Sequence, residues 1–138
     1  PYGDTFDAIL QNAPQPVLDS YPCLILTGDI RLKPEERDRY LAYAERGGTL
    51  MLNTVYLTQF PGLGFDRNDS AVTERPWGKG RIVVFGPDHD VAPLDGVIRK
   101  ELARLLPVSV TPDVEYLLNA DDDGVYLTLV NNRGVTKE

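Results

Sequence analysis

Short apolar runs alternate along the chain with stretches in which apolar residues recur every three or four positions. The run at 23–26 is apolar without alternation, which is typical of a strand buried on both faces of a parallel sheet. The runs at 49–52 and 81–85 are also predicted to be strands. A weaker run at 6–10 also has the character of a strand. The pattern therefore predicts a mainly parallel sheet whose strands are joined by crossover helices.

Two segments have the spacing of amphipathic helices. The first begins at Pro34, which suits the first helical turn, and ends at the glycine pair 47–48. The second carries apolar residues at 94, 97, 98, 102 and 105 and ends before Pro107. Residues 54–70 have no clear period, so we expect a long loop there that either covers a functional site or is mobile. The segment 72–75 is followed by a predicted turn at 76–80.

The chain changes character after Pro107. Residues 114–118 and 125–130 are predicted to form the two strands of a β-hairpin. The acidic run Asp121-Asp122-Asp123-Gly124 lacks the spacing of a calcium-binding EF-hand loop, so we interpret it as the hairpin turn. We expect an α/β domain at 1–107 and a hairpin segment at 108–138.

Composition excludes several classes of function. A net charge of −7, with no cluster of lysine and arginine, argues against non-specific nucleic-acid binding. No apolar run approaches the roughly 20 residues that a membrane-spanning helix needs, so no membrane partner is expected. The chain has a single cysteine, which excludes an internal disulfide. Since it also has a single histidine, a zinc site is not expected. No metal and no cofactor are predicted. The chain opens on Pro1 and not on methionine, so the compartment cannot be read from its start.

The candidate functional residues lie where the predicted parallel strands end. Ligands of open parallel sheets bind beyond the carboxyl ends of the strands. In this chain those ends carry Thr27-Gly28-Asp29, Asn53-Thr54 and Asp88-His89-Asp90. Trp77 is a further candidate because an aromatic face can stack on a sugar ring. These residues form the predicted ligand-binding set.

Each candidate also has a structural interpretation. Cys23 opens a buried strand, so we expect an unreactive core residue. His89 either bonds to Asp88 or Asp90 or contacts a ligand, and a metal role would require Asp88, Asp90 and Asp29 nearby. Asp29 either caps the next turn or contacts a ligand. Trp77 either packs on an edge hairpin or stacks on a sugar.

Three segments together resemble a known family. They are Tyr21–Asp29 (YPCLILTGD), Glu45–Asn53 (ERGGTLMLN) and Gly78–Asp90 (GKGRIVVFGPDHD). They are similar, in this order, to the strands and turns of class I glutamine amidotransferase-like domains, and the third is similar to the ThuA-like branch. The resemblance covers about residues 1–107. It implies a flavodoxin-like fold, of which the first strand and helix would be missing here.

The residue that defines the catalytic members of that family is absent. They use a cysteine on a sharp strand-to-helix turn, a histidine base and an acidic residue that orients it. The turn falls after Leu52 in this chain and carries Asn53-Thr54, with no cysteine. His89 matches the family histidine only approximately. We therefore expect no catalytic residue, although Thr54 could act as a nucleophile if a base lay beside it.

The resemblance also implies partners. Domains of this type occur as accessory or trimerisation modules in β-galactosidases and other carbohydrate-active proteins, and the segment 116–134 resembles the start of a β-sandwich that often follows them. The leading hypothesis is a non-catalytic assembly module that contacts other domains of a longer protein and forms homo-oligomers. One alternative is a sugar or small-molecule binding domain that uses Asp29, Asn53, His89 and Trp77. Another is a hydrolase that uses Thr54 or a water activated by His89.

Overall fold

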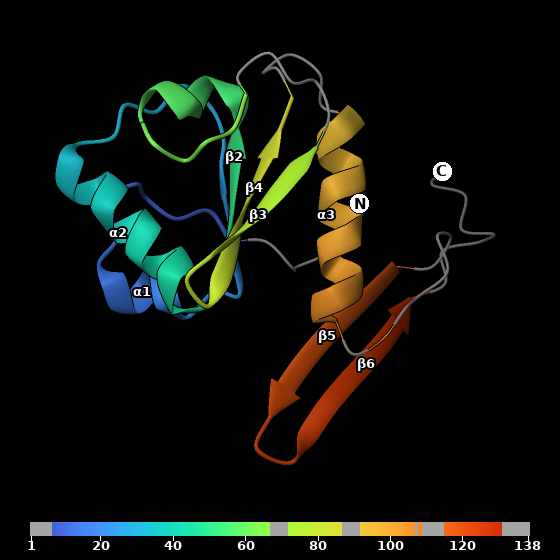
Figure 1. Ribbon diagram of the computed structural model, residues 1–138. Coiled ribbons are helices and arrows are strands. Elements are labelled where there is room, and N and C mark those ends of the chain that lie inside the picture. Colours follow the sequence, from blue (N-terminus) through green and yellow to red (C-terminus); the bar gives the residue numbers. More distant parts are fainter. Residues whose placement is uncertain (1–6, 67–71, 87–91, 107, 109–114, 131–138) are drawn as a thin grey trace, which may run out of the picture. The chain divides into compact units, whose positions relative to one another are not determined.

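The computed structural model describes residues 7–66, 72–86, 92–106, 108 and 115–130 (Figure 1). The chain divides into two compact units. One comprises Leu10–Leu105, and the other comprises Pro1–Ile9 together with Leu106–Glu138.

The larger unit contains a four-stranded sheet of order β1-β2-β4-β3. Strands β1 (Cys23–Leu26), β2 (Thr49–Asn53) and β4 (Gly80–Phe85) run parallel, and β3 (Thr73–Trp77) pairs antiparallel with β4. The predicted mainly parallel α/β sheet is therefore confirmed.

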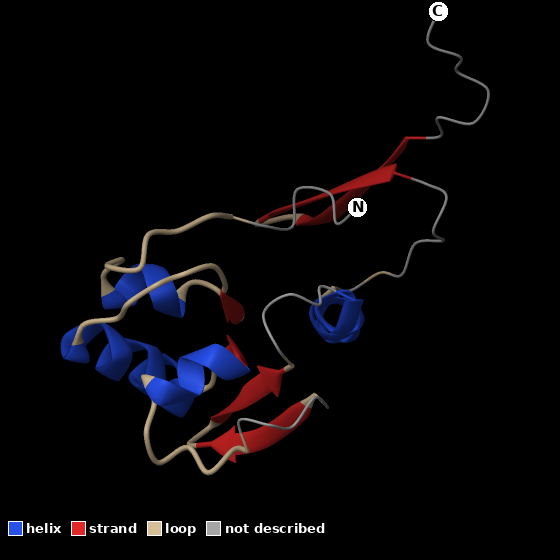
Figure 2. Cartoon of the chain, turned by 90° about the horizontal axis from the view of Figure 1, so that it is seen from above, coloured by secondary structure: helices blue, strands red, loops and turns tan. Residues whose placement is uncertain are grey.

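Helices cover both faces of this sheet. Helices α1 (Gln15–Asp19) and α2 (Pro34–Arg46) and the 3₁₀ helix η1 (Thr54–Thr58) lie on one side, and α3 (Ala92–Leu105) lies on the other (Figure 2). Because side chains alternate along a strand, β2 and β4 each supply both layers of the core. Leu50, Leu52, Ile82 and Val84 are buried on one face, whereas Met51, Val83 and Phe85 pack with Val97 of α3 on the other.

Local chemistry sets the ends of α2. The Lys33 backbone N–H donates to Oε2 of Glu36 over 2.8 Å, which satisfies a group that the first helical turn leaves unpaired. At the other end, Gly47 has φ 130°, a conformation that favours glycine. The helix end then meets the start of β4, where a Cβ on Gly80 would overlap the carbonyl oxygens of Gly48 and Ala44. Only glycine lets β4 approach α2 this closely.

The smaller unit contains the β-hairpin, formed by β5 (Glu115–Asp121) and β6 (Gly124–Val130). Oδ1 of Asp121 accepts hydrogen bonds from the backbone N–H groups of Asp123 (2.9 Å) and Gly124 (3.1 Å). The acidic run is thus part of the turn itself, as the sequence predicted, and the predicted C-terminal hairpin is confirmed.

Four local expectations differ from the structure. The long loop expected at 54–70 begins instead with the 3₁₀ helix η1. The strand expected at 6–10 is wrong for its described residues 7–10, which lie outside any strand and leave Leu10 78% exposed. Helix α1 was not predicted, because five residues that follow Pro14 and include Pro16 are too few to show a period. The turn expected at 76–80 is shorter, because β3 continues through Pro76 to Trp77. Proline is tolerated there because β3 is an edge strand.

Candidate functional site

The three parallel strands end at one edge of the sheet, at the top of Figure 1. Thr27, Gly28 and Asp29 follow β1 and are exposed, Asn53 ends β2, and Thr54 begins η1. The structure therefore brings two of the three predicted polar segments to the same edge. The third, Asp88-His89-Asp90, lies outside the described residues.

Asn53 has a structural role at this edge. Its side chain is 4% exposed, its Nδ2 donates to the Gly86 carbonyl over 2.8 Å, and its Oδ1 accepts from the Val55 N–H over 2.9 Å. The amide thus caps η1 and ties the end of β2 to the end of β4. Thr54 is buried beside it, so solvent and substrate have little access to its hydroxyl.

The loop after β1 is held by hydrogen bonds from η1 and the residue after it. The Tyr56 hydroxyl donates to the Gly28 carbonyl over 2.6 Å. The Gln59 side chain donates to the Ile30 carbonyl and accepts from the Leu32 N–H, both over 2.8 Å. These bonds fix the backbone of residues 28–32 without using the side chains of Asp29 and Arg31.

A hollow of about 550 Å³ lies between this loop and η1. Asp29 and Arg31 are the charged residues of its lining, and both are exposed. Carboxylate and guanidinium groups bind hydroxyl-rich or charged small molecules through directional hydrogen bonds. The full lining is Gly28, Asp29, Ile30, Arg31, Val55, Tyr56, Thr58 and Gln59.

Trp77 does not lie at this edge. It ends β3 and pairs with Gly80, the first residue of β4, so it sits at the amino end of the parallel strands. The residues of the predicted sugar site are therefore not brought together, since Trp77 is at the opposite end of the sheet from Asp29 and Asn53.

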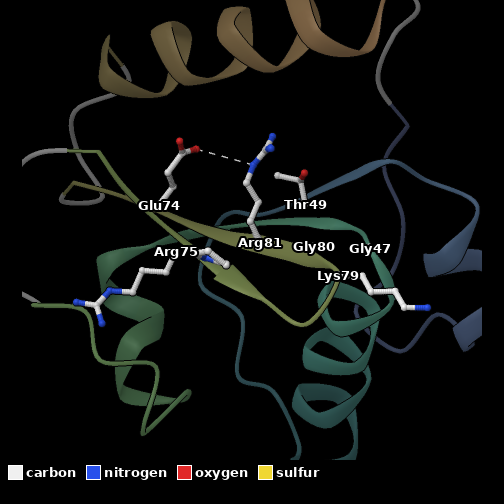
Figure 3. A pocket seen from close by; sticks show the side chains of 8 residues that line it. Gly47, Thr49, Glu74, Arg75, Lys79, Gly80 and Arg81 are labelled. Carbon is white, nitrogen blue, oxygen red and sulfur yellow. Dashed lines mark ion pairs between the residues drawn. The ribbon is translucent and has the colours of Figure 1, made fainter.

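A second hollow, of about 270 Å³, lies at that opposite end (Figure 3). Its polar side chains do not converge. Thr49, Glu74 and Arg81 point toward α3, whereas Arg75 and Lys79 extend away from it. The lining, Gly47, Thr49, Glu74, Arg75, Pro76, Lys79, Gly80 and Arg81, therefore straddles the sheet and does not enclose one ligand.

The charges on the α3 side of this hollow hold the helix against the sheet. The Arg81 guanidinium pairs with the buried carboxylate of Glu101, and Arg104 reaches the other Glu101 oxygen over 3.0 Å. Glu74 lies 3.7 Å from Lys100 and 3.8 Å from Arg104. We did not anticipate this network from the sequence. The feature of the sequence that indicates this ion-pair network is an acidic residue, Glu101, which lies four positions after Val97 on the apolar stripe of a helix.

Cys23 begins β1 and is partly buried on the α3 side of the sheet. Burial, reinforced by the negative charge of Glu101 and partly offset by Arg81, raises the pKa of the thiol from 9.0 to about 12. The thiolate, which is the reactive form, is therefore scarce at neutral pH. Among the described residues, no group of three or more histidine, cysteine, aspartate or glutamate side chains could hold a metal ion.

Comparison with models of protein families, with curated proteins and with solved structures finds no match to this chain. Within the described residues, no helix combines the length and the apolar character needed to cross a membrane.

Proposed function

We propose that this chain is a non-catalytic assembly module of a larger carbohydrate-active protein, built on the flavodoxin-like frame of class I glutamine amidotransferase-like domains. The strand order supports this frame. In the sheet, the parallel strands β1, β2 and β4 lie side by side in the same order in which they occur along the chain. The last three strands of a flavodoxin-like sheet, of order 2-1-3-4-5, are arranged in the same way.

The turn after β2 carries the non-catalytic part of the proposal. Catalytic relatives would place their cysteine there, whereas Asn53 is committed to two structural hydrogen bonds and Thr54 is buried. The chain's one cysteine lies at the start of β1, which is the opposite end of the sheet. The turn after β2 thus presents no accessible nucleophile where the family places its cysteine.

The hairpin supports the assembly part. Leu118 pairs with Leu127 and Tyr116 pairs with Leu129, so one face of the hairpin is apolar. Leu127 and Leu129 are 39% and 57% exposed. A two-stranded hairpin is marginally stable by itself, so this face gains stability when another part of the parent protein covers it.

Two measurements test the proposal. Purified chain incubated with glutamine should release no ammonia above a buffer control, and light scattering should show a mass above 15.3 kDa that depends on concentration. Ammonia release that disappears in Thr54→Ala would favour a hydrolase instead. A constant mass of one chain at every concentration would contradict an assembly role.

The hollow beside Asp29 and Arg31 favours a second candidate, a small-molecule or sugar binding domain. A ligand that binds the folded state raises the melting temperature. A library of sugars and small acids should then contain a compound whose stabilisation is lost in Asp29→Ala and Arg31→Ala but kept in Glu35→Ala, an exposed control on α2. A library in which no compound raises the melting temperature would leave the assembly role as the better proposal.

A further inference from the structure

The hollow between η1 and the loop after β1 is lined by two opposite charges, Asp29 and Arg31, which are both exposed. Within the described part of the chain, neither side chain takes part in a hydrogen bond or an ion pair, and the two do not pair with each other. Exposed charges elsewhere in the same unit do pair, as Arg46 does with Asp19 over 2.7 Å. The carboxylate and the guanidinium of the hollow are therefore both available to a ligand.

The backbone that carries these two charges is already ordered. The side chains of Tyr56 and Gln59 form hydrogen bonds to backbone groups of residues 28, 30 and 32. Asp29 and Arg31 each lie between two of these anchored residues. Binding then costs less conformational entropy than it would if the loop had to become ordered first. The hollow is thus preorganised for a ligand.

The hollow also offers apolar surface. Ile30 and Val55 line it, and Val55 is 40% exposed. Beside them, the Thr58 hydroxyl donates to the Val55 carbonyl over 3.0 Å, so its oxygen can still accept a hydrogen bond. A volume of about 550 Å³ is in the range of small-molecule sites, which combine apolar walls with a few polar groups that orient the ligand. This lining suits a ring that has an apolar face and polar groups around its rim.

The two charges restrict the chemistry of the ligand. A carboxylate accepts hydrogen bonds and a guanidinium donates them, so a ligand that contacts both must bring a donor to Asp29 and an acceptor to Arg31. A guanidinium binds carboxylates and phosphates most strongly, through two parallel N–H···O bonds. Asp29 repels such an anion. The anionic group of the ligand must therefore point to Arg31, and its donors must point to Asp29.

We propose that this hollow binds a sugar acid, which is a sugar ring that carries a carboxylate. The carboxylate contacts Arg31, ring hydroxyls donate to Asp29, and an apolar face of the ring lies on Val55. The inference rests on the second candidate for the function, a small-molecule or sugar binding domain, and names the class of its ligand.

Two other classes of ligand match these charges less well. A phosphate ester carries nearly two negative charges at neutral pH, so Asp29 repels it more than it repels a carboxylate. An α-amino acid has its charged donor on the carbon next to its carboxylate, whereas the hydroxyls of a sugar acid lie at several distances from the acid group. Because Asp29 and Arg31 do not approach closely enough to pair, a ligand with more widely spaced groups reaches both.

Melting temperatures of the full chain test the class of ligand. At least one of the hexuronates D-glucuronate, D-galacturonate and D-mannuronate should raise the melting temperature as its concentration increases, because it binds the folded state. The neutral sugars D-glucose, D-galactose and D-mannose lack the carboxylate, and sodium acetate lacks the ring. At equal concentration and ionic strength, these controls should raise the melting temperature much less.

A pair of cationic residues tests the contact with the carboxylate. Arg31→Ala should raise the dissociation constant of the hexuronate about tenfold or more, because hydrogen bonds to a charged group are lost. Lys33→Ala is the matched control, since it removes the same charge from an exposed side chain that does not line the hollow. It should change the dissociation constant by less than about twofold, because salt screens charges outside the contact. Isothermal titration calorimetry measures both, and unliganded Arg31→Ala should melt at the wild-type temperature.

Two substitutions of Asp29 test the contact with the hydroxyls. Asparagine keeps a side-chain oxygen that accepts from a hydroxyl, so Asp29→Asn should bind the hexuronate more tightly than Asp29→Ala does. A ligand held through an ammonium group would lose its ion pair in both variants. Equal dissociation constants for the two variants would therefore contradict the hydroxyl contact.

The outcomes separate this inference from the candidate function on which it rests. Neutral sugars that stabilise the chain as much as hexuronates do, or amino acids that stabilise it when hexuronates do not, would overturn the sugar acid and keep a binding domain. Equal weakening by Arg31→Ala and Lys33→Ala would overturn the contact with Arg31. A melting temperature that no hexuronate raises would contradict the sugar acid, while the wider library still decides whether the hollow binds any small molecule.

Discussion

At the scale of single residues, the polar groups at the carboxyl edge divide into those that hold the fold together and those that reach solvent. Asn53 belongs to the first kind, because both ends of its amide are bonded to backbone groups. Asp29 and Arg31 belong to the second kind, since both are exposed beside the hollow. A change in the first kind should alter stability, and a change in the second should alter binding.

Asn53→Ala should lower the free energy of unfolding by about 1–3 kcal/mol. The substitution leaves the Gly86 carbonyl and the Val55 N–H without their partner in a buried place. Urea denaturation followed by circular dichroism measures the change. Asn12→Ala, at an exposed position, is the control and should shift stability by less than about 0.5 kcal/mol. Equal effects of the two substitutions would contradict the capping role of Asn53.

Cys23 should react slowly with a thiol reagent in the native state and fully after denaturation, because its pKa is raised to about 12. The same shift has a consequence for stability. Below pH 9 the thiol is protonated in both the folded and the unfolded state, so its ionisation does not change the free energy of unfolding. Between pH 9 and 12 only the unfolded state ionises, so stability falls as the pH rises.

Urea denaturation in steps of pH from neutral to alkaline tests this dependence. The alkaline loss should be smaller in Cys23→Ala than in wild type. Part of it should remain, because burial also raises the pKa of Tyr43. Rapid labelling of native chain at neutral pH would contradict the position assigned to Cys23.

At the scale of elements, the start of β4 is the point at which several parts of the fold meet. Gly80 touches the end of α2, Arg81 pairs with α3, and the preceding residue Lys79 donates its N–H to the Glu45 carbonyl over 2.8 Å. The parallel strand, both helical layers and the β3–β4 turn are thus joined within three consecutive residues.

Gly80→Ala should therefore destabilise the fold strongly, by more than about 2 kcal/mol, because the added methyl group would overlap backbone oxygen atoms that cannot move independently. Gly96→Ala is the matched control. A Cβ at Gly96 would have open space around it, and alanine is favoured over glycine in a helix by about 1 kcal/mol. Thermal unfolding should show the two substitutions moving the melting temperature in opposite directions.

The attachment of α3 gives another prediction at this scale. Arg81→Met leaves the buried Glu101 carboxylate with Arg104 alone, which should cost about 1–3 kcal/mol. The double variant Arg81→Met, Glu101→Met should recover most of this loss, since it removes the buried charge as well. Urea denaturation of both variants measures the loss in the free energy of unfolding. A double variant as unstable as the single one would show that this loss comes from packing and not from charge.

The sequence predicted those elements whose pattern was long or strongly apolar. Runs such as 49–52 and the stripe through Val97 and Ile98 marked a buried strand and a helix that the structure contains. Helix α1 is too short to show a period, and the position of Trp77 depends on the antiparallel direction of β3, which no local pattern encodes. The polar carboxyl edge was predictable from strand ends, but the structural role of Asn53 required knowing that β2 and β4 are neighbours.

At the scale of the whole molecule, charge opposes the proposed self-association. Each chain carries a net charge of −7, so two copies repel one another. The hairpin face that supports the assembly role pairs Tyr116 with Leu129 and Leu118 with Leu127, all uncharged, so salt does not weaken a contact made through it.

Self-association should therefore become stronger as the salt concentration rises. The screening length falls from about 30 Å at 0.01 M to about 10 Å at 0.1 M ionic strength, which reduces the repulsion between copies. Light scattering at these two ionic strengths should give a lower dissociation constant at the higher one. A dissociation constant that increases with salt would indicate an interface built on ion pairs and would contradict an apolar contact.

The order β1-β2-β4-β3 also has a consequence for the synthesis of the chain. Strand β3 is made before β4, but its one neighbour among the described strands is β4. A nascent chain that has emerged from the ribosome only as far as residue 79 holds β1 and β2, together with a β3 that has no strand to join. Residues 80–85 bring in the strand that links β2 to β3, so the sheet can close only after they have left the exit tunnel.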